Sequence, residues 1–97
     1  EGNGIVLDTS PTLGGTLDAG TRNIFFGDGN GTNTGELRFG NGTDLRIFHD
    51  GTASRIVNSN GNLLLDASSS SGDLYLNSGD DIFIRPNGNR KWNYSYW

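Results

Sequence analysis

The sequence predicts an all-β chain of short, stacked strands, and three observations support this prediction. A small unit recurs in which a polar residue precedes an aliphatic residue, a variable residue and a second apolar residue. Asn-Gly and Asp-Gly pairs, which are typical of tight turns, separate the units. Apolar residues do not recur at helical spacing for more than a turn, and Gly or Asn interrupts almost every ten-residue window.

The recurring unit defines the predicted strands. Each unit suits a strand of about three to five residues, with two apolar side chains on one face and the middle residue on the other. Successive units begin 7 to 13 residues apart, which leaves room for one strand and one turn. Their first aliphatic residues are Ile24, Leu37, Leu45, Ile56, Leu63, Leu74 and Ile82.

The two faces of these strands differ in composition. The middle residue varies and includes Arg38 and Arg46, as expected of an outward face. The flanking positions are almost purely Leu, Ile and Phe, as expected of an inward face. The predicted core consists of Ile24, Leu37, Phe39, Leu45, Ile47, Ile56, Leu63, Leu65, Leu74, Leu76, Ile82 and Ile84.

The size of this core predicts that several chains share it. Only 32% of the 97 residues are hydrophobic, and chains of this size with weak cores often need oligomerisation. A single-chain solenoid needs roughly 18 or more residues per coil, which exceeds the observed spacing. We therefore expect each chain to supply one wall of an intertwined homotrimeric β-helix or β-prism, because cyclic symmetry closes three walls and removes exposed edges.

Three segments are predicted along the chain. Residues 1–22 form an extended, turn-rich N-terminal segment, residues 23–91 the β-repeat shaft, and residues 92–97 an aromatic C-terminal strand. The chain begins with Glu1 rather than Met, so we expect a fragment or a processed product.

Composition excludes several functional classes. The chain has no Cys and one His, so a disulfide framework and the usual zinc ligand sets are absent. Its net charge of −4 without a basic stripe argues against nucleic acid as a partner. No apolar run is long enough for a membrane span, and no signal peptide is recognisable.

No residue set predicts catalysis or a cofactor. The acidic residues are spread about one per repeat, and Asp44, Asp73 and Asp81 occupy the same position before a strand, where a carboxylate can accept turn amides. Residues 40–45 resemble half of a calcium-binding nonapeptide, and residues 28–33 begin like an EF-hand loop, but both patterns are incomplete. We therefore expect no enzyme activity, no resident metal and no cofactor.

Two features carry open binding hypotheses. In a trimer, three copies of His49 could approach the axis and hold a metal or anion, although a turn residue bonded to a neighbour is the simpler interpretation. Both tryptophans lie in the C-terminal run, where an exposed aromatic face could stack on sugar rings or close the trimer. The candidate glycan or receptor contacts are Trp92, Tyr94, Tyr96 and Trp97.

Several stretches resemble repeats of bacteriophage structural proteins. Asp44–Gly51, continuing to Ser54–Ile56 and Gly61–Leu63, resembles a repeat in tail-fibre and other structural proteins of phages, particularly marine ones. Asp8–Asp18 resembles another segment common in such proteins, and Gly88–Trp92 resembles the stretch that often follows.

These matches cover most of residues 8–92 in the same order, although the family usually has Tyr where this chain has Phe48. The resemblance implies a virion structural protein, namely a β-rich, trimeric shaft or tip segment of a tail fibre that presents a host receptor-binding end. It further implies a location in the virion, extracellular after release. The expected partners are copies of the chain, other tail proteins and a host-surface glycan.

Two other hypotheses remain open. A monomeric β-sandwich could bind carbohydrate through the C-terminal aromatic strand, since seven short strands suffice for a sandwich. A secreted, calcium-dependent β-roll is a weaker alternative, and it should unfold with a chelator.

Overall fold

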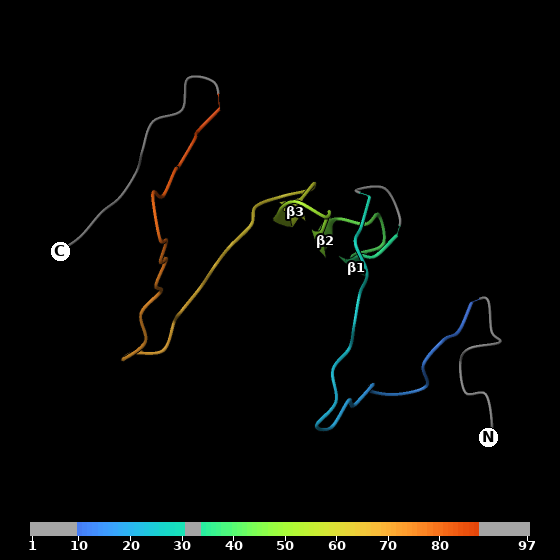
Figure 1. Cartoon of the computed structure of the whole chain (residues 1–97). Helices are drawn as coiled ribbons and strands as arrows, with labels where there is room; N and C mark the ends of the chain where they lie inside the picture. The colour runs from blue at the N-terminus through green and yellow to red at the C-terminus, as the bar shows by residue number, and fades with distance from the viewer. Residues whose placement is uncertain (1–9, 31–33, 88–97) are drawn as a thin grey trace. The chain divides into compact units, whose positions relative to one another are not determined.

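The computed structural model describes residues 10–30 and 34–87 of the chain. Within these ranges it contains three strands and no helix: β1 (Leu37–Phe39), β2 (Leu45–His49) and β3 (Ser54–Asn58) (Figure 1). The predicted all-β fold class is therefore confirmed for the described residues. The chain divides into two units, Glu1–Asn62 and Leu63–Trp97, and all three strands belong to the first.

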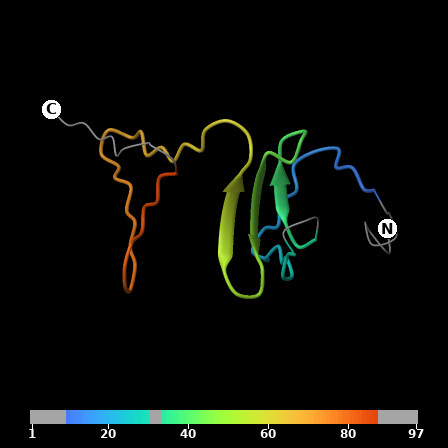
Figure 2. The ribbon, with the colours of Figure 1, turned by 90° about the horizontal axis from the view of Figure 1, so that it is seen from above.

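The strands form one antiparallel sheet in the order β1–β2–β3, with the three arrows side by side in Figure 2. Ile47 lies at its centre, because it pairs with Leu37 of β1 and with Ile56 of β3. Directly opposed residues of neighbouring strands project from the same face of a sheet. The register therefore brings three residues of the predicted core side by side.

A tight connection over residues 40–44 joins β1 to β2. The backbone amide of Asp44 donates to the carbonyl of Phe39 at 2.9 Å, and that of Thr43 donates to the carbonyl of Gly40 at 3.2 Å. Gly40 has a φ of 92°, and a Cβ there would collide with the Asp44 carboxylate. Position 40 thus requires glycine for two reasons: its backbone has a positive φ, and the Asp44 side chain leaves no room for a Cβ.

The hairpin between β2 and β3 turns at Asp50-Gly51, as the sequence predicted. Asp50 Oδ1 accepts hydrogen bonds from the amides of Thr52 at 3.0 Å and Ala53 at 2.8 Å. The amide of Asp50 donates in turn to the carbonyl of Ala53 at 3.0 Å. Side-chain acceptance of turn amides by Asp is a recurrent way to fix such loops.

The register defines two chemically different faces of the sheet. The apolar face carries Leu37, Phe39, Leu45, Ile47 and Ile56. The charged face carries Arg38, Arg46, Phe48, Arg55 and Val57. The two middle residues that were predicted to point outward, Arg38 and Arg46, thus lie opposite each other on the charged face.

Phe48 is the one large hydrophobic side chain that is buried among the described residues, with 8% exposure. It lies on the charged face, whereas the predicted core lies on the apolar face. Gly29 lies close to this ring, because its amide donates to the His49 carbonyl at 2.7 Å and a Cβ at position 29 would lie 3.1 Å from Phe48 Cδ2. The described single chain thus buries a ring on its charged face, while the core predicted to be shared between chains stays a prediction.

Four of the seven predicted strand units form no strand in the described structure. These units lie at residues 24–26, 63–65, 74–76 and 82–84. Each shows a strand-like alternation, because its middle residue is more exposed than its flanking residues. For example, Leu64 is 79% exposed, compared with 46% for Leu63. The periodicity predicted from the sequence is present in these units, but a paired neighbour is not.

Candidate functional site

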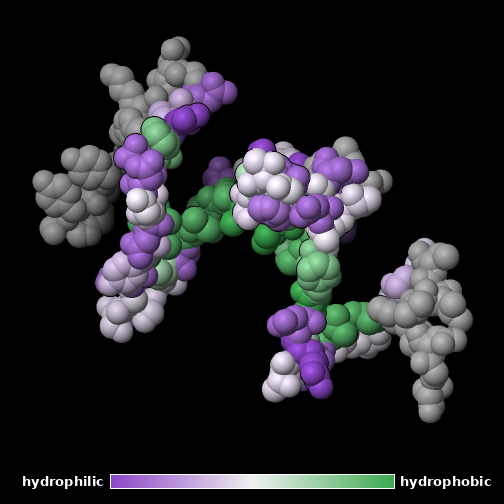
Figure 3. Space-filling model, viewed as in Figure 1, coloured by the Kyte–Doolittle hydropathy of each residue, from purple (hydrophilic) through white to green (hydrophobic). Residues whose placement is uncertain are grey.

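The apolar face of the sheet is uncovered in the described part of the chain. Leu37, Phe39, Ile47 and Ile56 are exposed, and Leu45 is half-buried. The predicted core residues outside the sheet are exposed as well: Ile24, Leu63, Leu65, Leu74, Leu76, Ile82 and Ile84. Figure 3 shows that hydrophobic residues, coloured green, lie at the surface.

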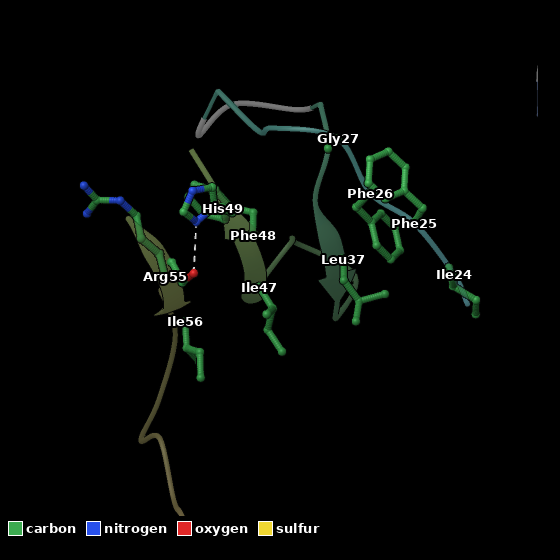
Figure 4. A pocket seen from close by; sticks show the side chains of 12 residues that line it. Ile24, Phe25, Phe26, Gly27, Leu37, Ile47, Phe48, His49, Arg55 and Ile56 are labelled. Carbon is green, nitrogen blue, oxygen red and sulfur yellow. Dashed lines mark hydrogen bonds between the residues drawn. The ribbon is translucent and has the colours of Figure 1, made fainter. Parts of the chain in front are cut away.

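An open groove of about 600 Å³ runs along this face. Leu37, Ile47 and Ile56 point the same way from three adjacent strands, and Phe25 and Phe26 lie beside them on the segment that precedes the sheet (Figure 4). Solvent-exposed apolar patches of this kind mark interaction surfaces in soluble proteins. The groove is therefore a candidate surface for burial against another chain.

His49 lies at one end of this groove. Its Nδ1 atom is within hydrogen-bonding distance of the Ser54 hydroxyl, at 3.0 Å across the end of the hairpin, as the dashed line in Figure 4 marks. Within one chain, His49 is thus a hairpin residue bonded to a cross-strand neighbour. The described ranges hold no group of three or more His, Asp and Glu side chains that could bind a metal ion.

Ion pairs organise the charged face. Glu36, whose side chain is 1% exposed, accepts from Arg38 Nε at 3.0 Å and from Arg46 Nη1 at 3.4 Å. The guanidinium of Arg46 also lies over the ring of Phe48, 5.4 Å from its centroid. This stacked arrangement favours the cation through the ring quadrupole. Arg46 is therefore held in one orientation by a carboxylate and an aromatic ring.

A second ion pair lies at the hairpin. Arg55 Nε donates to Asp50 Oδ2 at 2.7 Å, while Asp50 Oδ1 accepts the two turn amides. The hydrogen bond from the Ala53 amide, the bond from Arg55 and the bond from the Thr52 amide hold the pKa of Asp50 well below its ordinary value. Asp50 therefore remains ionised throughout the neutral and mildly acidic range.

The two arginines border a polar depression, which we call the charged hollow. It has a volume of about 330 Å³ and lies between β2, β3 and the segment that precedes β1. Its lining consists of Asn30, Arg46, Phe48, Asp50, Arg55 and Val57. Sequence reasoning missed this site, although the alternation through Arg46 and Phe48 could have placed both on one face.

The structure leaves several predicted site residues untested. Trp92, Tyr94, Tyr96 and Trp97 lie outside the described residues, as do positions 31–33 of the EF-hand-like stretch. Residues 40–45, which resemble half of a calcium repeat, form the turn between β1 and β2 and the start of β2.

Comparisons with protein-family models, with curated proteins and with solved structures give no match. In the described part of the chain, no helix has the length and hydrophobicity that a membrane crossing requires.

Proposed function

We propose that this chain is a structural segment of a phage tail fibre, in which three copies form a rigid β shaft that presents a host receptor-binding tip. The proposal rests on the resemblance of residues 8–92 to phage structural repeats together with the surface chemistry of the single chain. In this proposal the protein belongs to the virion, contacts other tail proteins, and reaches a host-surface glycan after release.

The open apolar face is the observation that carries the proposal. Ile47 sits at the centre of a three-stranded sheet and is nevertheless 40% exposed. Burying apolar surface stabilises a fold by roughly 25 cal/mol per Å². An uncovered row of Leu, Ile and Phe side chains therefore does not contribute the hydrophobic free energy that it could. Copies of the same chain can supply the cover, since a rotation axis repeats the same apolar face on every chain.

The unpaired strand units add a second line of support. The described hydrogen bonds include none from the backbone of residues 63–65, 74–76 or 82–84. Short strands with free edges pair readily with other chains, and closed assemblies remove such edges. Intertwined copies would satisfy the backbone of these units and bury their apolar residues in one step.

The first test is the absolute mass in solution, measured by light scattering after size exclusion, with and without a chelator. A mass near three times the 10.4 kDa of one chain, unchanged by the chelator, supports the fibre segment. A mass of one chain contradicts it and directs attention to the carbohydrate-binding alternative. Loss of structure with the chelator instead points to a calcium-dependent β-roll.

A matched pair of variants tests the shared core. Leu45→Asp places a charge on the apolar face, which burial between chains cannot tolerate. Asn60→Asp introduces the same charge at an exposed position after β3. We expect loss of the trimer and aggregation or unfolding for Leu45→Asp alone. A folded, soluble Leu45→Asp monomer contradicts the shared core.

A further inference from the structure

The charged face of the sheet offers a binding site that the fibre role does not explain. If the apolar face is buried between chains, the opposite face of the same sheet points away from the shared core, because side chains alternate across a strand. The charged hollow would then be open to solvent on the side of the shaft.

The polar groups of the hollow are held in place before any ligand arrives. Arg46 is fixed by Glu36 and by the ring of Phe48, and its side chain is 19% exposed. Arg55 is fixed through Nε, which donates to Asp50 at 2.7 Å. Side chains that are already ordered lose little conformational entropy when they bind a ligand.

Arg55 retains donors toward solvent. Its side chain is 54% exposed, and the described hydrogen bonds engage only its Nε atom. The terminal N–H groups of a guanidinium match the geometry of carboxylate and phosphate oxygens, with which they form charge-assisted bonds. The neighbouring Arg46 adds a second positive charge from the adjacent strand.

The remaining lining suits a sugar ring rather than a bare anion. Asn30 and Asp50 contribute an amide and a carboxylate to this lining, and Val57 with the small exposed part of Phe48 contributes apolar surface. The two carboxylates of this region, Glu36 and Asp50, already accept hydrogen bonds from the arginines. A volume of about 330 Å³ is at the low end for small-molecule sites, so it fits about one monosaccharide unit.

We propose that the charged hollow binds a single sugar residue that carries a carboxylate or phosphate group, with Arg55 and Arg46 contacting the anionic group. This inference deepens the proposed function, because it names a class of surface glycan for a fibre to recognise. The inference depends on the proposed function in one respect, namely that the charged face points away from the shared core. The hollow itself does not depend on it, because one sheet and the segment before it form the hollow within a single chain.

The test uses the full chain, isotopically labelled, in an NMR titration with three probes. Methyl β-D-glucuronide carries the carboxylate, glucose 6-phosphate carries the phosphate, and methyl β-D-glucoside is the neutral control. We expect saturable shifts of the Arg46, Phe48 and Arg55 amides with at least one anionic probe. The neutral glucoside should bind about tenfold more weakly, and added salt should weaken anionic binding. The two anionic probes distinguish the carboxylate from the phosphate.

Two variants assign the effect to the hollow. Arg55→Gln should weaken anionic binding about tenfold, because it removes a charged hydrogen-bond donor. Arg85→Gln removes the same charge in the second unit, where Arg85 stacks on Phe83, and it should leave affinity unchanged. If Arg55→Gln does not fold, the comparison of anionic and neutral probes on the unaltered chain still decides the matter.

Three results would overturn the inference. They are the absence of saturable shifts at about 10 mM probe, equal binding of the glucoside, and unchanged anionic binding by folded Arg55→Gln. The solution mass of the same sample tests the fibre proposal independently of the titration, which tests sugar binding. A trimer without sugar binding overturns only the hollow, whereas a monomer that binds anionic sugar overturns only the fibre.

Discussion

Gly29 lies so close to Phe48 that a Cβ added at Gly29 would be 3.1 Å from the Cδ2 atom of the Phe48 ring. The same Cβ would lie 2.9 Å from the Thr34 carbonyl oxygen. Glycine at position 29 therefore lets the preceding segment cover the one buried aromatic ring of the described sheet. The covering segment and the ring form a small core on the charged face.

Gly29→Ala should destabilise this core by about 1–3 kcal/mol, because the backbone must shift to admit the methyl group. Gly27→Ala is the matched control, since a Cβ there meets nothing within 4 Å. Denaturant unfolding at a fixed chain concentration measures both variants, and equal midpoints for the two would contradict the contact.

The alternation of the sequence predicts much of this fold, but not which face a single chain buries. The pairing of Leu37, Ile47 and Ile56 and the turn at Asp50-Gly51 follow from period-two spacing and turn chemistry. Phe48 was outside the predicted core because its burial depends on Gly29, a residue far away in sequence. Local periodicity contains no information about such a long-range contact.

The charged hollow could not be predicted from the sequence for a related reason. The ion pair of Asp50 and Arg55 spans five residues and depends on the exact register of the hairpin. Short, Gly-rich strands specify register weakly, so sequence alone did not place these side chains together.

Asp50 should make stability depend on pH in the acidic range. The pKa of Asp50 in the folded chain lies well below the ordinary value of 3.8. Its ionised carboxylate therefore contributes fully to the free energy of unfolding at pH values above about 4. The contribution falls as the pH drops below about 4, because the unfolded chain then binds the proton more readily. Asp50→Asn should lower stability at neutral pH and flatten the acid limb of the curve.

Unfolding midpoints between pH 2 and 7 measure this dependence for the unaltered chain and Asp50→Asn. Asp66→Asn is the control, because the exposed Asp66 carboxyl takes part in no hydrogen bond or ion pair among the described residues. An identical acid limb in the unaltered chain and Asp50→Asn would show that the hairpin bonds are not formed in solution.

The second unit gives a test of the proposed shared core that is independent of the sheet. Leu74 and Leu76 flank Tyr75, which is 75% exposed, compared with 55% for Leu74. Leu74→Asp should dissociate or unfold the assembly, because it places a charge where copies are expected to pack. Tyr75→Asp adds the same charge on the opposite side of the segment and should leave the mass unchanged. Light scattering measures the mass of both variants. Dissociation by both would contradict the prediction that Leu74 faces the other chains while Tyr75 faces away from them.

Glu36 should be the charge whose loss most affects the sheet. Its side chain is 1% exposed and receives hydrogen bonds from two arginines, at 3.0 and 3.4 Å. Glu36→Gln removes the negative charge that faces Arg38 and Arg46 while keeping the shape of the side chain. Because both arginines are partly exposed, we expect a loss of about 1–2 kcal/mol rather than the larger cost of a fully buried pair.

A double-mutant cycle isolates the pairwise part of this effect. Arg38→Gln alone, Glu36→Gln alone and the two together should give a coupling energy of about 0.5–1 kcal/mol, since the pair is geometrically close but partly solvated. High salt should reduce the coupling only modestly, because the carboxylate is buried. Additive effects of the two substitutions would mean that Glu36 acts through Arg46 alone, and the same cycle with Arg46→Gln would then show the larger coupling.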